Sequence, residues 1–176
     1  MKLGYFLSCE ENGPAELVRQ AKLAEEAGFH ALWISDHFHP WIDEQGHSPF
    51  VWSVIGALSE ATDMRVTTGV TCPTTRIHPA IVAQAAATAS VMLDGRFQLG
   101  VGSGEALNEH VLGARWATIE RRLEMLEEAV EVMRSTASTT CRTSRRRCSC
   151  RASGRSRCSS PPGSATATAP PRPMPR

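Results

Sequence analysis

The sequence lacks two features that would direct the chain into or across a membrane. It contains no apolar run near the roughly 20 residues that a membrane-spanning helix requires. Its first residues pass directly from Met1 and Lys2 into strand-like sequence, without the charged segment, apolar stretch and small-residue cleavage site of an export signal. We therefore expect a cytoplasmic protein with no membrane partner. Cysteine is also scarce before residue 135, where only Cys9 and Cys72 occur, and two such residues indicate free thiols.

Residues 135–176 lack every large apolar side chain and every carboxylate. They contain no Leu, Ile, Val, Phe, Trp or Tyr, and their nine arginines stand among Ser, Thr, Pro, Ala, Cys, Gly and one Met. Such a segment cannot bury enough surface to offset the entropy of ordering its backbone, so we expect a disordered tail. Residues 1–134 instead carry 18 acidic and ten basic side chains, so the net charge of +1 describes neither part.

The composition changes abruptly after Arg134. A GC-rich gene read out of register yields this mixture of residues, so we favour a frameshift, which predicts no evolved fold or function for the tail. The alternative is a genuine Arg-rich tail that binds nucleic acid, because clustered arginines release counterions from phosphates. The tail has no aromatic residues to stack on bases, so we do not expect a nucleic-acid partner. Its four cysteines lack paired Cys-x-x-Cys spacing and the tail contains no histidine, so we expect no zinc there.

Residues 1–134 alternate short apolar runs with amphipathic segments. We expect strands over residues 3–7, 31–35, 65–71 and 97–101, and helices from Pro14 to a cap at Gly28 and over 49–61, 79–93 and 119–134. Strands that are apolar on both faces and alternate with helices are typical of a parallel sheet covered by helices. The pattern fits an open doubly wound sheet or a TIM barrel, although a barrel needs eight such units and the sequence supplies four.

Polar and small residues follow three of the expected strands. The clusters are residues 35–41 (Ser-Asp-His-Phe-His-Pro-Trp), 69–74 (Gly-Val-Thr-Cys-Pro-Thr) and 100–105 (Gly-Val-Gly-Ser-Gly-Glu). The carboxyl ends of parallel strands open on one face of the sheet, which carries the binding site in such folds. We therefore expect the three clusters to converge on one pocket.

The first cluster offers acid–base chemistry. His37 titrates near neutral pH and suits a general base or acid, Asp36 can accept a hydrogen bond from a ligand, and Trp41 offers a flat apolar wall. An equally simple interpretation makes His37 and His39 ordinary loop histidines and Asp36 the cap of a local turn. A metal site of Asp36, His37 and His39 is conceivable, but neighbouring residues of an extended loop point in different directions, so we expect no metal.

The other two clusters could hold a ligand through their backbone. The spacing Gly-x-Gly-x-Gly-Glu differs from the Gly-x-Gly-x-x-Gly fingerprint of dinucleotide-binding folds and follows the fourth strand rather than the first. Glu105 could bind a heterocycle, or it could only complement a helix dipole. Gly69 and Val70 could adopt an unusual geometry under a planar ligand, or they could simply end a strand. We expect Cys72 to be a small buried residue rather than a nucleophile.

The motifs in residues 35–41, 73–85 and 100–109 resemble those of luciferase-like monooxygenases. Within that class they resemble the coenzyme F420-dependent oxidoreductases related to F420-dependent glucose-6-phosphate dehydrogenase. The resemblance covers residues 1–134 and implies a partial TIM barrel, made of the first four βα units, with the deazaflavin across the carboxyl ends of the strands. A flavin-dependent monooxygenase of the same class, with FMN as its cofactor, is the alternative.

The resemblance also implies a reaction and roles for individual residues. His37 would take the proton of a substrate hydroxyl, in a sugar phosphate or another alcohol, as hydride passes to the deazaflavin. Trp41 would line the reaction site, and Glu105 would lie near the ring and stabilise or protonate it. Further cofactor contacts would come from Asp36, Gly69, Val70, Gly102 and Ser103. Gly69 and Val70 would be joined by a cis peptide bond.

The tail begins where relatives of this family continue through four more βα units. Those units supply the rest of the cofactor phosphate site and the basic residues that hold a substrate phosphate. We therefore expect turnover to be slow or absent in a chain truncated after about residue 134. Full-length relatives suggest a homodimer.

Overall fold

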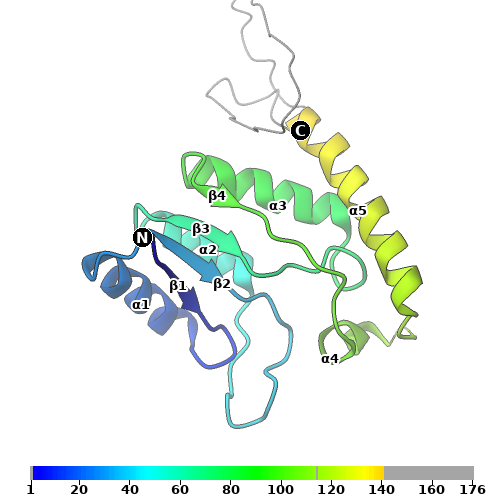
Figure 1. Cartoon of the computed structure of the whole chain (residues 1–176), viewed down its shortest axis with the longest axis horizontal. Coiled ribbons are helices and arrows are strands. Elements are labelled where there is room, and N and C mark those ends of the chain that lie inside the picture. The colour runs from blue at the N-terminus through cyan, green and yellow to red at the C-terminus, as the bar shows by residue number, and fades with distance from the viewer. Residues whose placement is uncertain (1, 114, 141–176) are drawn as a thin grey trace, which may run out of the picture.

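The computed structural model describes residues 2–113 and 115–140 (Figure 1). Most of the tail expected to be disordered, residues 141–176, lies outside the described residues. The elements in chain order are β1 (Gly4–Leu7), α1 (Pro14–Glu26), β2 (Ala31–Ile34), α2 (Val51–Ser59), β3 (Arg65–Thr68), α3 (Pro79–Met92), β4 (Phe97–Gln98), α4 (Ala106–Glu109), the 3₁₀ helix η1 (His110–Leu112) and α5 (Ile119–Thr140). The predicted alternation of strands and helices is confirmed.

The four strands form one parallel sheet in the order β1-β2-β3-β4. Leu7 pairs with Ile34, and Ile34 pairs with Thr68, so the strands β1, β2 and β3 end at the same level. Beyond β3 and β4, a single bridge joins Thr71 to Val101. The chain segments that follow the strands therefore lie together at one end of the sheet, where Figure 1 also shows α4.

Helices α1 and α2 cover one face of the sheet. Leu7, Leu32 and Ile34 from the strands are buried in one core with Leu17 of α1 and Ile55 of α2. The core excludes water on this face, and each fully buried aliphatic side chain there contributes about 1.5–3 kcal/mol.

Strand residues next in sequence to these buried ones point to the other face of the sheet. Phe6 of β1 and Trp33 of β2 are 51% and 49% exposed. Side chains alternate between the faces of a strand, so only one of the two apolar faces expected from the sequence is covered in the described part of the chain. The other face presents aromatic side chains beside the carboxyl ends of the strands.

Proline and glycine define the helix ends as their chemistry predicts. Pro14 and Pro79 occupy the first positions of α1 and α3, and Gly28 follows α1 with a φ of +85°. The last helix continues past its expected end at Arg134 to Thr140.

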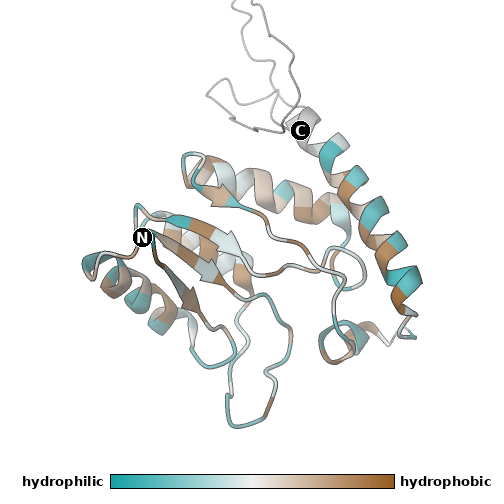
Figure 2. Cartoon of the chain, viewed as in Figure 1, coloured by the Kyte–Doolittle hydropathy of each residue, from teal (hydrophilic) through white to brown (hydrophobic). Residues whose placement is uncertain are grey.

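Helix α5 lies along α3, and hydrophobic and hydrophilic positions alternate along it (Figure 2). Met133 and Val130 pack against Val82 of α3, as their helical spacing predicts, whereas Leu123 of the same predicted stripe is 54% exposed. No helix in the described ranges is both long and apolar enough to cross a membrane.

Candidate functional site

The carboxyl ends of the strands bring together the two side chains predicted to carry proton chemistry. His37 follows β2, and Glu105 precedes the first turn of α4. The Nε2 atom of His37 lies 3.3 Å from the Oε1 atom of Glu105. Their side chains are 21% and 31% exposed, so both can be reached from solvent. The prediction that these clusters converge at one place is confirmed for this pair.

The other nitrogen of the His37 ring contacts a second carboxylate. Nδ1 lies 2.6 Å from Oε1 of Glu10, which follows β1 and is 3% exposed. Ser35 and Ser8 donate hydrogen bonds of 2.8 and 3.0 Å to the other oxygen of Glu10. The Glu10 carboxylate is therefore fixed by three contacts, and it orients the imidazole so that Nε2 faces Glu105.

This carboxylate changes the proton affinity of the ring. The hydrogen bond to Glu10 raises the pKa of His37, burial opposes that rise, and the charges of Glu10, Glu105 and Asp36 add to it. Burial would raise the pKa of Glu10, but hydrogen bonds from His37, its own backbone and Ser35 outweigh burial and lower it. Glu10 thus remains ionised and makes His37 a stronger base than an exposed histidine.

Trp41 lies beside the imidazole, as expected for a wall of the site. The two ring centroids are 5.4 Å apart in an edge-on arrangement, and the indole is 54% exposed. The main-chain N–H of Trp41 donates a 2.8 Å hydrogen bond to the side chain of Gln45. The loop after β2 therefore presents an apolar surface next to the base.

Asp36 is buried and bound by protein donors on both oxygens. Thr71 donates to Oδ2 at 2.8 Å, and the Arg76 guanidinium donates to Oδ1 at 2.9 Å. The side chains of Asp36 and Arg76 are 1% and 7% exposed. The alternative in which Asp36 caps a local turn is wrong, because its partners follow the next strand. A metal ion at Asp36 would have to compete with this ion pair.

A second acidic group completes this ion cluster. The Oε2 atom of Glu109 in α4 accepts a 3.0 Å hydrogen bond from the main-chain N–H of Arg76, and its other oxygen lies 3.8 Å from Arg76 Nε. Burial raises the pKa of Glu109, although the Arg76 backbone and charge oppose that rise. Arg76 therefore joins the loops that follow β2, β3 and β4.

The glycines of the predicted cofactor site have a packing role. The peptide bond between Gly69 and Val70 is cis, as the resemblance implies, and Val70 is 44% exposed. A Cβ atom on Gly102 would lie 2.7 Å from Val70 Cγ2, and the Gly102 N–H already donates to Thr71. Gly102 thus permits close contact within the protein, and its N–H is not directed at a ligand. Ser103 is half-buried in the same loop.

Sequence reasoning did not assign a role to four residues of the site: Glu10, Arg76, Asn108 and Glu109. A signal for Glu10 is present, because it follows the first strand in the way that the three predicted clusters follow the others. Arg76, Asn108 and Glu109 fall within the motifs of the resemblance, but their partners are distant in the chain. Among the residues that the structure describes, no group of three or more potential ligands is placed to hold a metal ion.

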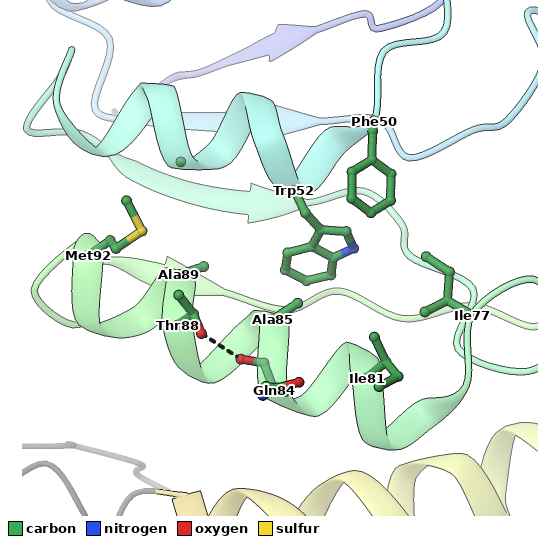
Figure 3. Close-up of a pocket in the computed structure, with 10 residues that line it drawn as sticks. Phe50, Trp52, Ile77, Ile81, Gln84, Ala85, Thr88, Ala89 and Met92 are labelled. Atoms are coloured by element: carbon green, nitrogen blue, oxygen red, sulfur yellow. Dashed lines mark hydrogen bonds between the residues drawn. The ribbon is translucent and has the colours of Figure 1, made fainter. Parts of the chain in front are cut away.

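A separate cavity of about 360 Å³ lies between α2 and α3 (Figure 3). Figure 3 shows Phe50 and Trp52 on one side and Ile81 on α3 on the other. Its lining contains no Asp, Glu, His, Lys, Arg or Cys. It therefore lacks a group for proton transfer, and it does not include His37 or Glu105.

Several known proteins are similar to this chain in sequence and in fold. The family described as luciferase-like monooxygenase matches residues 1–174. An F420-dependent glucose-6-phosphate dehydrogenase of Amycolatopsis mediterranei is 45% identical over 136 residues, which are 76% of this chain and 41% of that protein. Another, from Intrasporangium calvum, is 46% identical over 139 residues, again 76% of this chain and 41% of the relative. The chain thus spans about two-fifths of the length of these relatives.

Solved structures show the same likeness. An F420-dependent secondary alcohol dehydrogenase in complex with an F420-acetone adduct has a TM-score of 0.73 and 42% identity, over 76% of this chain and 41% of that one. The F420-dependent tetrahydromethanopterin reductase of Methanopyrus kandleri has a TM-score of 0.62 at 24% identity, over 75% and 39% of the two chains, and shows the fold alone. These matches confirm the predicted fold class, a partial TIM barrel.

Proposed function

The chain belongs to the luciferase-like monooxygenase family, and we propose that it carries the site of an F420-dependent oxidoreductase that acts on a hydroxyl group. One observation supports this most strongly: an imidazole whose Nδ1 is held by Glu10 directs Nε2 toward a partly exposed carboxyl, that of Glu105. Such an arrangement can remove a hydroxyl proton and hold it beside a second acidic group.

The residues around this pair fit a planar redox cofactor. A deazaflavin needs an apolar surface for its ring and polar groups at the ring edge. Trp33 on the uncovered face of the sheet is 49% exposed, Val70 in the segment after β3 is 44% exposed, and His37 and Glu105 supply the polar edge. We propose that Val70, Ser103 and Glu105 contact the coenzyme, that Gly69 and Gly102 let the main chain approach it closely, and that buried Asp36 holds these loops in place beside it. Bound there, the deazaflavin supplies a two-electron acceptor for hydride.

His37 acts as the base in this proposal. Nε2 of His37 would take the proton of the substrate hydroxyl as that group becomes a carbonyl, and a bound deazaflavin would accept the hydride that leaves the substrate carbon. The hydrogen bond to Glu10 raises the pKa of His37 and stabilises the imidazolium that forms. Oxidation needs the neutral ring, so the rate should rise as pH increases through this raised pKa.

Glu105 and Trp41 define where the substrate hydroxyl lies. Glu105 Oε1 is within 3.3 Å of the base, so a proton can be held at either atom. Trp41 stands edge-on to the imidazole and would give the substrate site an apolar wall. Asp36 cannot rotate away, because Thr71 and Arg76 each hold one of its oxygens. A small alcohol or a sugar phosphate is the substrate class that the named relatives suggest.

A fluorescence titration with F420 tests the proposal on the 176-residue chain. We expect saturable binding of F420 and weaker binding of FMN, followed by at most slow loss of the oxidised-F420 absorbance when glucose 6-phosphate or a secondary alcohol is added, because the chain spans only part of the length of its relatives. His37→Ala should abolish turnover but retain binding. His30→Ala is the matched control, because His30 is exposed and lies before β2, at the other end of the sheet.

Three results would contradict the proposal. They are preferential binding of FMN, binding of neither cofactor, and equal activity of His37→Ala and the wild type. Binding of F420 without turnover would retain the cofactor assignment and reject the oxidation of these two substrate classes by this chain.

A further inference from the structure

Asn108 lies between the two loops that carry the proposed base and its carboxyl partner. It belongs to α4 and is 1% exposed. Its Oδ1 atom accepts hydrogen bonds from the main-chain N–H groups of Phe38 and His39, at 2.7 and 2.8 Å. Its Nδ2 atom donates a 2.6 Å hydrogen bond to Oε1 of Glu105. One buried side chain therefore contacts both loops.

Only an amide makes this set of contacts. Two N–H donors meet at Oδ1, which has two lone pairs, and a carboxylate oxygen meets the NH₂ group. With the amide reversed, the NH₂ group would face two N–H donors, and the carbonyl would face Glu105, so both ends would repel. A carboxylate at this position would retain the first contact and lose the second, and an aliphatic side chain would lose both.

We propose that Asn108 is a positioning residue: its amide joins the main chain after His37 to the Glu105 carboxyl and thereby holds Nε2 and Oε1 at the observed separation. The catalytic meaning of this role rests on the function proposed above. The role itself is a property of the hydrogen bonds and can be measured without the coenzyme.

No other described residue makes the same connection. Arg122 donates to the main-chain oxygen of Gly104, and Glu109 accepts from the main chain of Arg76. Both contacts restrain the backbone near α4, but neither is a bond to the Glu105 side chain. Asn108 bonds to the Glu105 oxygen that also faces His37. Its loss should therefore alter the environment of the imidazole and not only the stability of the loop.

Two substitutions separate the two halves of the amide. Asn108→Leu removes both contacts, and Asn108→Asp preserves the acceptor but places a negative charge against Glu105. The charged groups facing His37 are Glu10, Asp36 and Glu105, and an added carboxylate next to Glu105 should raise the pKa of His37 further.

Nuclear magnetic resonance of the whole 176-residue chain measures both effects. In Asn108→Leu, the amides of Phe38 and His39 should exchange with solvent about tenfold faster, the ratio that corresponds to the net free energy of one hydrogen bond. In Asn108→Asp those amides should stay protected, but the titration midpoint of the His37 ring should move to higher pH. Amides of β2 serve as the internal reference for the intact fold.

Two controls match these variants. Gln45 also accepts two main-chain N–H bonds through its side-chain oxygen, from Trp41 and Ile42, but does not contact Glu105. Gln45→Leu should leave the solvent exchange of the Phe38 and His39 amides as in the wild type. Gln84→Glu adds a charge on the exposed side of α3 and should not move the His37 titration.

The positioning role would be overturned by wild-type exchange at Phe38 and His39 in Asn108→Leu, or by an unmoved His37 midpoint in Asn108→Asp. An F420 titration of the wild type separates this result from the proposed function. Failure to bind F420 together with the expected NMR changes would reject the function and keep the positioning role.

Discussion

Replacing Arg76 by methionine removes the cation that joins three loops of the site. The substitution preserves much of the aliphatic volume but leaves the Asp36 and Glu109 carboxyls buried without their positive partner. Their side chains are 1% and 2% exposed, so bulk solvent does not screen their charges. The main-chain N–H of residue 76 still donates to Glu109, because that bond does not involve the side chain.

The distances set the size of the effect. With Arg76 atoms 2.9 Å from Asp36 and 3.8 Å from Glu109, each attraction amounts to about 4–6 kcal/mol at an effective dielectric constant of about 20. Much of this is offset in the wild type by the cost of burying the guanidinium. Removing one partner of a buried ion pair nonetheless destabilises proteins by about 3–5 kcal/mol, because the other charge stays buried. We expect a loss in this range near neutral pH.

The loss should depend on pH with a definite sign. Burial already raises the pKa of Glu109, and removal of the guanidinium raises it further. A carboxyl whose pKa is raised by folding contributes favourably below its unfolded pKa, and that contribution is lost as pH rises through the folded pKa. The deficit of the variant should therefore grow as pH rises above the ordinary pKa of a glutamate.

Urea unfolding, followed by tryptophan fluorescence and circular dichroism, measures the free energy of unfolding at each pH. Arg121→Met is the matched control, because Arg121 forms an ion pair with Glu124 in which both side chains are more than half exposed. We expect no measurable change in the control. Equal stabilities of the two variants, or a deficit of Arg76→Met that shrinks as pH rises, would refute the cluster as a source of stability.

Three further substitutions or treatments test separate features. Glu10→Gln should lower the pKa of His37 toward its ordinary value. A raised histidine pKa stabilises the folded state at pH values below that pKa. The wild type should therefore exceed the variant in free energy of unfolding by the largest amount near about pH 6, and by less at higher pH. Gly104→Ala should lower the free energy of unfolding by about 2–4 kcal/mol, because its φ is +76° and the added Cβ would lie 2.6 Å from the Cys72 sulfur. Gly113→Ala, where φ is +73° but the space is open, should lower it by only about 1 kcal/mol. Urea unfolding that shows the larger loss in Gly113→Ala would contradict this. Cys9 is fully buried, and burial raises the pKa of its thiol to about 12. Peptide mapping after treatment with iodoacetamide should therefore find Cys9 unmodified in the native chain. Rapid modification would contradict the burial of this side chain.

The sequence predicts the elements well where local chemistry determines them. Pro14 and Gly28 mark a helix start and end that depend only on fixed φ and missing Cβ atoms. The third strand is shorter than expected because pairing ends at Thr68, before the cis peptide, and resumes only at the bridge from Thr71 to Val101. Local patterning contains no information about that interruption.

The site is predicted only in part, because its contacts depend on the fold. His37 and Glu105 can be predicted as site residues because each follows a strand. The carboxylate that orients His37 belongs to Glu10, after β1, and it can be identified only when β1 is known to lie next to β2. Likewise, the neighbouring sequence of Asn108 predicts only an ordinary helix residue. Its hydrogen bonds from Phe38 and His39 can be identified only when α4 is known to lie beside the loop after β2.

The place where F420 binds shows whether the coenzyme lies at the carboxyl ends of the strands. Spectra of isotopically labelled chain recorded with increasing F420 should show shifts at the His37 ring, Val70 and Glu105, with intermolecular Overhauser contacts from the deazaflavin ring to the same residues. Shifts confined to Phe50, Trp52 and Ile81 would place the coenzyme in the cavity between α2 and α3 and would contradict the proposed site.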